Sequence, residues 1–157
     1  MKLGVYDIIN NPLPQLNLIK EIEVNKKDFE YDEDIVKIMN KHLKMDKLSS
    51  ENIYALSLTK GGLPRGIIHV SKGKCDSAEC DMRGLAIGLL LTGAESFMCF
   101  HNHPGGSKEI SDNDINATKN YKELGNLIGV YLIRHIMITQ NFFSSCEDPG
   151  DSYIPFS

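Results

Sequence analysis

Two histidines, His101 and His103, stand two residues apart at the end of an apolar run, and Ser111 and Asp114 follow them. In an extended strand, residues i and i+2 point to the same face, so both imidazoles can face one metal ion. Ser111 and Asp114 have the spacing of a helix capping box, which places the Asp114 carboxylate in a first helical turn. Two imidazoles and one carboxylate leave the fourth tetrahedral position to water, as in catalytic zinc sites. These residues predict an open zinc site, and iron and manganese remain alternatives.

A hydrolytic site also needs a general base for the attacking water and a donor for the developing negative charge. Ser111 lies close to Asp114 in the chain and can supply the donor. Glu51 is a candidate base on its position alone, at the start of an expected strand, and Glu109 and Asp112 are equally open on that evidence. The residues by themselves do not choose between the three carboxylates.

A mixed α/β fold is expected to bring these side chains together. The expected strands cover 18–24, 52–59, 66–71, 96–100, 130–139 and 142–145, and the expected helices cover 32–43, 82–91 and 112–128. The turn signal at Gly61 and Gly62 predicts that the second and third strands are antiparallel. Helices interleaved with several strands predict an α/β sandwich, in which a mainly antiparallel sheet is flanked by helices.

The 157 residues suffice for one domain with a sizeable core. Apolar residues make up 41% of the chain, which excludes wholesale disorder. We expect residues 1–50 to add a lead-in strand and helix to that domain, residues 51–146 to form its core, and residues 147–157 to be a polar tail. The sequence does not indicate the oligomeric state.

The formal net charge of -4 does not support nucleic-acid binding, because phosphate neutralisation needs clustered Lys and Arg. A local basic patch, for example around Lys108 and Lys119, leaves such binding open. The first residues do not resemble a signal peptide, and no apolar run approaches the length of a membrane span. We therefore expect a cytoplasmic protein with no membrane partner.

The cysteines match neither a zinc ribbon nor a small disulfide framework. Cys75 and Cys80 could share a metal or a disulfide, although reduced bystanders are favoured in a cytosolic protein. His135 is interpreted as a packed or hydrogen-bonded residue rather than a fourth ligand. His69 and His42 are interpreted as structural or surface residues.

The run His-Asn-His-Pro at 101–104, followed by Ser-Asp-Asn-Asp at 111–114, resembles the signature of the JAMM (JAB/MPN) metalloproteases. Its His-Asn-His-Pro form is similar to the RadC branch of bacterial and phage proteins. Glu51 matches the catalytic glutamate of that family, 81–83 resembles the start of its helix before the central strand, and 133–139 resembles a later strand.

The resemblance implies that His101, His103 and Asp114 are zinc ligands. It implies that Glu51 accepts a proton from the attacking water and passes it to the leaving nitrogen, and that Ser111 steadies the tetrahedral intermediate. The reaction implied is zinc-dependent hydrolysis of an amide, peptide or isopeptide bond, in a peptide or protein substrate that the sequence does not identify.

The resemblance covers about Leu18 to Cys146 and implies the cytidine-deaminase-like sandwich of JAB/MPN domains, with a JAMM core at 51–146. Two positions depart from the family pattern. Gly105 replaces the usual Ser after His-Asn-His-Pro, and Arg134 stands where Asp commonly precedes His. The second change puts in doubt any role of that Asp behind the metal ligands.

Two other functions stay open. The first is a metal-containing binding module without turnover that acts in DNA metabolism, as the RadC association with DNA repair implies; the acidic charge argues mildly against it. The second is a metal-dependent nuclease or phosphoesterase, but such sites often bridge two metals with several carboxylates, and this motif has one. The letters His-Asn-His do not indicate an HNH nuclease, whose residues are spread over a longer unit.

Overall fold

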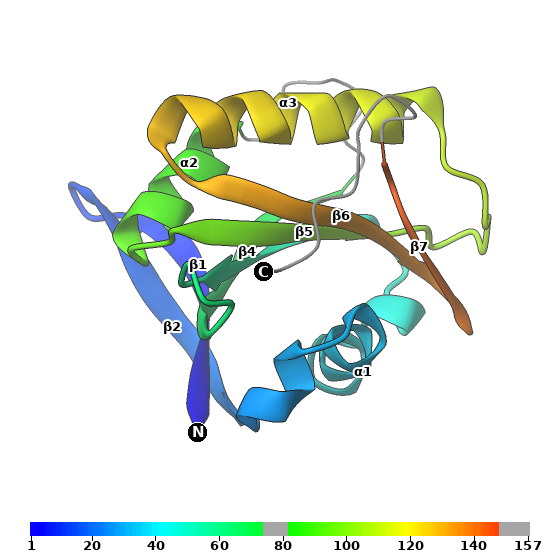
Figure 1. Cartoon of the computed structure of the whole chain (residues 1–157), viewed down its shortest axis with the longest axis horizontal. Helices are drawn as coiled ribbons and strands as arrows, with labels where there is room; N and C mark the ends of the chain where they lie inside the picture. The colour runs from blue at the N-terminus through cyan, green and yellow to red at the C-terminus, as the bar shows by residue number, and fades with distance from the viewer. Residues whose placement is uncertain (74–81, 148–157) are drawn as a thin grey trace.

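The structure, a computed structural model, describes residues 1–73 and 82–147 of the chain. Within these residues, a seven-stranded sheet lies between helix α1 on one face and helices α2 and α3 on the other (Figure 1). The strands are β1 (Lys2–Asn10), β2 (Pro14–Glu23), β3 (Asn52–Leu58), β4 (Pro64–Lys72), β5 (Ser96–Asn102), β6 (Tyr131–Thr139) and β7 (Phe142–Ser145). The helices are α1 (Asp32–Leu43), α2 (Met82–Leu91) and α3 (Asp112–Ile128), with short 3-10 turns at Lys26–Phe29 and Met45–Lys47. The arrangement confirms the predicted mixed α/β class.

The strands lie in the order β2-β1-β4-β3-β5-β6-β7. Strand β3 is antiparallel to both of its neighbours, β4 and β5, and the predicted turn at Gly61 and Gly62 makes the first of these pairs a hairpin. The pairs β1–β4 and β5–β6 are parallel. All residues of β5 are buried, as expected for a strand covered on both faces. The metal-site candidates therefore begin at the end of a central strand.

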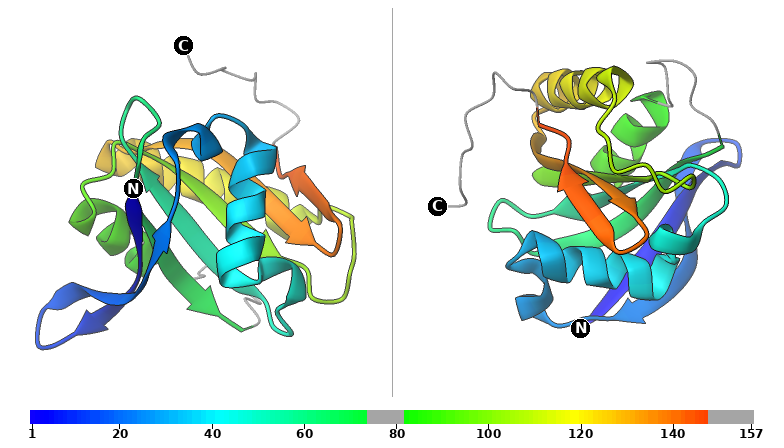
Figure 2. Two further views of the ribbon diagram at one scale, coloured as in Figure 1. Left: turned by 90° about the horizontal axis from the view of Figure 1, so that it is seen from below. Right: turned by 90° about the vertical axis from the view of Figure 1, so that its right-hand side faces the viewer.

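Alternate residues of β5 contribute side chains to two hydrophobic cores, one on each side of the sheet. Phe100 joins the core that contains α1, and Cys99 joins the core that contains α2 and α3. Because side chains alternate along a strand, His101 belongs to the α2/α3 side and Asn102 to the α1 side. Figure 2 shows α1 and the short helical turns on one side of the sheet, opposite α2 and α3.

The N-terminal part of the sheet differs from the prediction. Strand β1 was not expected, and β2 begins at Pro14 instead of Leu18. Most of β2 faces solvent at the edge of the sheet, so its sequence carries little of the alternation that marks a half-buried strand. Strand β1 enters the sheet beside β4, a pairing between segments far apart in the chain. Strand β5 also continues two residues beyond the predicted end, through His101 and Asn102.

In the described part of the chain, no helix is long and apolar enough to cross a membrane. Cys99 and Cys146 are buried free thiols. Cys75 and Cys80 lie outside the described residues, as do Asp81 and residues 148–157 of the expected tail. The division of the chain at residues 51 and 146 stays a prediction.

Helix α3, which carries Asp114, rests closely on the start of β6 through Gly125. The Gly125 carbonyl accepts a hydrogen bond of 2.8 Å from the Val130 N–H. A Cβ added at Gly125 would lie 2.3 Å from the Val130 carbonyl oxygen and 3.0 Å from the Phe97 ring. The backbone oxygen cannot move aside without shifting the helix, so glycine sets the distance between α3 and the sheet.

We expect Gly125→Ala to lower the free energy of unfolding by roughly 1–3 kcal/mol, because it overpacks this contact. The loss should appear in urea unfolding, although alanine gains about 1 kcal/mol over glycine inside a helix. Gly61→Ala is the control, since its Cβ would meet no atom closer than the Thr59 hydroxyl at 3.9 Å. Equal stability of the two variants would show that α3 tolerates a wider spacing.

Candidate metal centre

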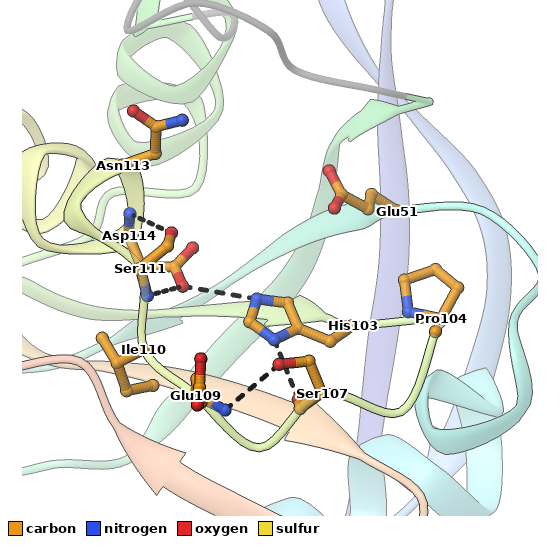
Figure 3. A pocket seen from close by; sticks show the side chains of 10 residues that line it. Glu51, His103, Pro104, Ser107, Glu109, Ile110, Ser111, Asn113 and Asp114 are labelled. Atoms are coloured by element: carbon orange, nitrogen blue, oxygen red, sulfur yellow. Dashed lines mark hydrogen bonds and ion pairs between the residues drawn. The ribbon is translucent and has the colours of Figure 1, made fainter.

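Three predicted ligands, His101, His103 and Asp114, converge where β5 ends and α3 begins. The Nε2 atom of His101 lies 3.1 Å from Nε2 of His103 and 3.1 Å from one carboxylate oxygen of Asp114. The other Asp114 oxygen lies 3.3 Å from Nε2 of His103 (Figure 3). A tetrahedral ion with bonds of about 2.05 Å places its ligand atoms roughly 3.3 Å apart. The distance between the two imidazole nitrogens, and the distance from each to its nearest Asp114 oxygen, are therefore close to those between ligands of one tetrahedral ion.

The Nδ1 atoms of both histidines point away from this centre. His103 Nδ1 lies 3.1 Å from the Ser107 carbonyl oxygen, which can only accept, so the ring donates there. His101 Nδ1 lies 2.7 Å from Nε2 of the buried His135. The direction of this second hydrogen bond follows from the residues behind His135.

A chain of hydrogen bonds runs from His101 into the interior. The Thr118 hydroxyl donates to the Cys146 carbonyl oxygen at 2.7 Å and, as an alternative, to the Asp114 carbonyl oxygen at 2.9 Å. Its oxygen then accepts from Nδ1 of His135, which lies 2.7 Å away. Burial lowers the pKa of His135 well below its ordinary value, so the ring is neutral and its Nε2 accepts from His101.

This series of hydrogen bonds fixes a proton of His101 on Nδ1 and directs its Nε2 toward the centre. In metal sites, a hydrogen bond on the far side of a histidine ligand orients the ring and raises its basicity. His135 is hydrogen-bonded, in agreement with its interpretation from the sequence. Its link to His101 was not anticipated, and neither was Thr118; the one signal in the sequence was a histidine inside a strand otherwise rich in apolar residues.

Ser111 and Asp114 form the predicted capping box. The Asp114 N–H donates to the Ser111 hydroxyl oxygen at 3.1 Å, and the Ser111 N–H donates to an Asp114 carboxylate oxygen at 2.9 Å. Burial alone would raise the pKa of Asp114, but the neighbouring His101 ring and the hydrogen bonds to Ser111 outweigh it and hold the pKa well below its usual range. Asp114 is therefore ionised, and the capping box fixes the direction of its carboxylate.

A pocket of about 440 Å³ opens over this centre. Its lining includes His103, Ser111 and Asp114 together with two of the three candidate bases, Glu51 and Glu109. Figure 3 shows Glu51 across the pocket from Ser111 and Asp114, with His103 between them. Asp112, the third candidate, is exposed at the start of α3 and is not among the described residues that line the pocket.

The pairing of β3 with β5 explains why Glu51 faces the centre. Ile53 pairs with His101 in this antiparallel ladder. Two residues further along, in opposite directions on the two chain segments, the same register places Glu51 opposite His103. Residues two apart share a face, and Glu51 therefore lies on the side of the sheet that carries both histidines.

A second group of metal-binding residue types, His101, His135 and Cys146, lies within the interior. The 2.7 Å separation of the two ring nitrogens is that of a hydrogen bond and is shorter than the spacing of two ligands on one zinc ion. Burial also raises the pKa of the Cys146 thiol to about 12, whereas metal binding needs the thiolate. The group at His101, His103 and Asp114 is the better candidate.

The two departures from the family pattern lie away from the ligand atoms. Arg134 Nε lies 2.7 Å from an Asp32 carboxylate oxygen, and its Nη1 lies 3.2 Å from Oε1 of Glu147, so the side chain connects β6 to the start of α1. At Gly105, a Cβ would meet no described atom within 4 Å. The two ion pairs given for Arg134 thus join it to Asp32 and Glu147 and to none of the three proposed ligands.

Comparison with known proteins identifies similar sequences. The profile of the RadC-like JAB domain matches residues 29–150. A UPF0758 protein of Clostridium beijerinckii is 33% identical over 106 residues, which are 68% of this chain and 46% of that protein. A UPF0758 protein of Clostridium botulinum is 32% identical over 144 residues, which are 90% of this chain and 53% of that protein. One from Listeria monocytogenes is 35% identical over 98 residues, which are 62% of this chain and 38% of that protein.

The chain thus spans about half the length of the curated relatives it matches. The names of these relatives state no activity, so the comparisons bear on ancestry and fold and leave the reaction to be argued from the site.

The Thr118 hydroxyl connects the hydrogen bonds behind His101 to backbone carbonyl groups. Substitution of Thr118 therefore tests these hydrogen bonds. We expect Thr118→Val to lower the free energy of unfolding by about 1–3 kcal/mol, because the buried His135 N–H loses its acceptor. Thr118→Ser keeps the hydroxyl and should lose much less. Urea unfolding of the two variants measures the difference, and equal losses would mean that the methyl group, not the hydroxyl, matters.

Proposed function

The chain belongs to the RadC-like JAB domain family, and from this premise we propose that it is a zinc-dependent hydrolase of JAMM type that cleaves an amide, peptide or isopeptide bond. His101, His103 and Asp114 hold the metal, Glu51 is the general base, and Ser111 is the donor to the developing oxyanion. The substrate is a peptide or protein of unknown identity.

One observation carries the proposal: the Nε2 atoms of His101 and His103 and the Asp114 carboxylate converge within 3.1–3.3 Å of one another. Both histidines use their Nδ1 protons elsewhere, so their Nε2 atoms bring lone pairs to a centre that Asp114 completes with a negative charge. Two such lone pairs 3.1 Å apart have the spacing of two ligand atoms on one metal ion. Two imidazoles and one carboxylate suit zinc, and a site with three protein ligands keeps a position for water.

Zinc, when bound, supplies a Lewis acid and lowers the pKa of a coordinated water to about 7. Glu51 accepts the proton that the water gives up as its oxygen bonds to the substrate carbonyl carbon. Ser111 donates a hydrogen bond to the carbonyl oxygen as negative charge grows on it. Glu51 then passes the proton to the nitrogen of the breaking C–N bond, so that the products are a carboxylic acid and an amine.

The assignment of the base is supported by position. Glu51 shares the pocket and the sheet face of the ligands, and the register sets it opposite His103. Glu109 shares the pocket but lies in the exposed loop between β5 and α3. A carboxylate held by a strand end is the better placed of the two, because catalytic groups need a fixed distance to the reacting atoms.

Metal content tests the ligand set. We expect one zinc per chain in the reconstituted protein by elemental analysis, and we expect Asp114→Ala to lose it, because the carboxylate supplies the negative charge at the centre. Asp112→Ala is the matched control: it removes an aspartate two residues away, in the same helical turn, that faces solvent. Wild-type protein without metal after reconstitution would refute the proposal, as would equal loss in the two variants.

Turnover tests the base. The probes are a pool of internally quenched peptides and a pool of lysine-branched isopeptides. We expect Glu51→Gln to keep its zinc and to lose 10²- to 10⁴-fold in kcat on the best probe, the range for removal of a general base. Glu109→Gln should retain most of the wild-type kcat.

The opposite result, a large loss for Glu109→Gln alone, would transfer the role of base to Glu109. A wild-type chain that holds zinc and hydrolyses neither pool would favour the alternative of a metal-containing binding module without turnover.

A further inference from the structure

Glu51 lies just before β3, outside the regular ladder, so something other than strand pairing must hold it in place. The side chain of Asn102, the residue between the two histidines, does so. The Asn52 N–H donates to the Asn102 side-chain oxygen at 2.7 Å, and the Asn102 side-chain nitrogen donates to the Ser50 carbonyl oxygen at 3.0 Å. The two hydrogen bonds hold the backbone in place on either side of Glu51.

The orientation of this amide is unambiguous. A backbone N–H can only donate and a backbone carbonyl can only accept, so the Asn102 oxygen must face Asn52 and its nitrogen must face Ser50. Asn102 is 1% exposed, which removes competition from bulk water. Asparagine is suited to the position because it offers one donor and one acceptor on a short side chain.

Neighbouring residues complete the restraint. The Gly73 N–H donates to the Glu51 carbonyl oxygen at 2.8 Å. The Asn52 side-chain nitrogen donates to the Ser50 carbonyl oxygen at 3.0 Å, and the Asn52 side-chain oxygen lies 2.9 Å from Nε2 of His69. The backbone of residues 50, 51 and 52 is therefore bound at three consecutive positions.

The alternation of side chains along β5 relates these hydrogen bonds of Asn102 to the candidate metal centre. His101 and His103 point to one side of the sheet, and Asn102 points to the other and across to β3. The last regular pair of the ladder is Ile53 with His101. Beyond this pair, the Asn102 side chain makes the hydrogen bonds to the segment that carries Glu51. Three successive residues at the end of β5, from His101 to His103, therefore supply both histidines and the support for Glu51.

We infer that Asn102 is a positioning residue, which holds the Glu51 carboxylate at its working distance from the centre at His101 and His103. The inference rests on the proposed function, in which Glu51 is the general base. Asn102 acts through Glu51 and does not itself contact the reacting atoms.

A double-mutant cycle on the zinc-loaded chain tests this. On the best probe of the two pools, Asn102→Ala should lower kcat roughly 10- to 100-fold, as displacement of a catalytic group does. In a Glu51→Gln background the same change should cost less than about twofold, because the group it positions is already absent. Zinc content should stay at one per chain in all variants.

Amide hydrogen exchange gives a readout that needs no turnover. The Asn52 amide should exchange at least about 10-fold faster in Asn102→Ala, since it loses its acceptor, and should be unchanged in Glu51→Gln. Ser96→Ala is the control for both measurements: it removes a hydrogen bond of 2.9 Å to the Thr59 carbonyl oxygen at the other end of the same strand pair. It should leave kcat and the Asn52 amide unchanged.

The outcomes distinguish a failure of the role inferred for Asn102 from a failure of the proposed function. Equal losses from Asn102→Ala in the wild-type and Glu51→Gln backgrounds would overturn the inference alone, since the residue would then act generally on the fold. An equal loss of kcat in Ser96→Ala would do the same. A wild-type chain that binds no zinc or hydrolyses no probe would overturn the proposed function, and the inference with it.

Discussion

The hydrogen bond from His101 to His135 is the interaction on which the arrangement of the centre depends. Because His135 is buried and neutral, and because Thr118 accepts its Nδ1 proton, His101 donates from Nδ1 and turns its Nε2 toward His103 and Asp114. The reverse tautomer would turn an N–H toward His103 and Asp114 and close the centre to a cation. Two residues that touch no ligand atom at the centre thus decide whether it can hold a metal.

The fold places this interaction where it is best protected. Strand β5 is buried along its whole length, and β6 brings His135 beside it in a parallel pair that joins Cys99 to His135. Helix α3 then lays its first turn over the strand end, and its close contact at Gly125 sets how near Asp114 comes. His101 and Asp114 belong to β5 and α3, whereas His103 follows the end of β5 and its Nδ1 donates to the Ser107 carbonyl oxygen in the loop between the two elements.

The sequence predicts the local part of this site and not its long-range part. His101 and His103 follow from strand alternation, and Asp114 follows from the capping box, because both patterns act over a few residues. Most element boundaries of the central sheet are predicted for the same reason. Strand β1 was missed because neither of its partners gives a local signal in the sequence. One partner, β2, is mostly exposed, and the other, β4, is a parallel strand far away in the chain. The links from His135 to His101 and from Asn102 to Ser50 join residues more than thirty positions apart, and only the sheet register reveals them.

X-ray absorption at the zinc edge of the reconstituted chain tests the central claim most directly, because it counts the ligand atoms by type. The account predicts nitrogen and oxygen scatterers alone at about 2.0–2.1 Å, with the multiple-scattering pattern of two imidazoles. A sulfur scatterer at about 2.3 Å would contradict it, since it would place the metal on a cysteine thiolate and not at His101, His103 and Asp114.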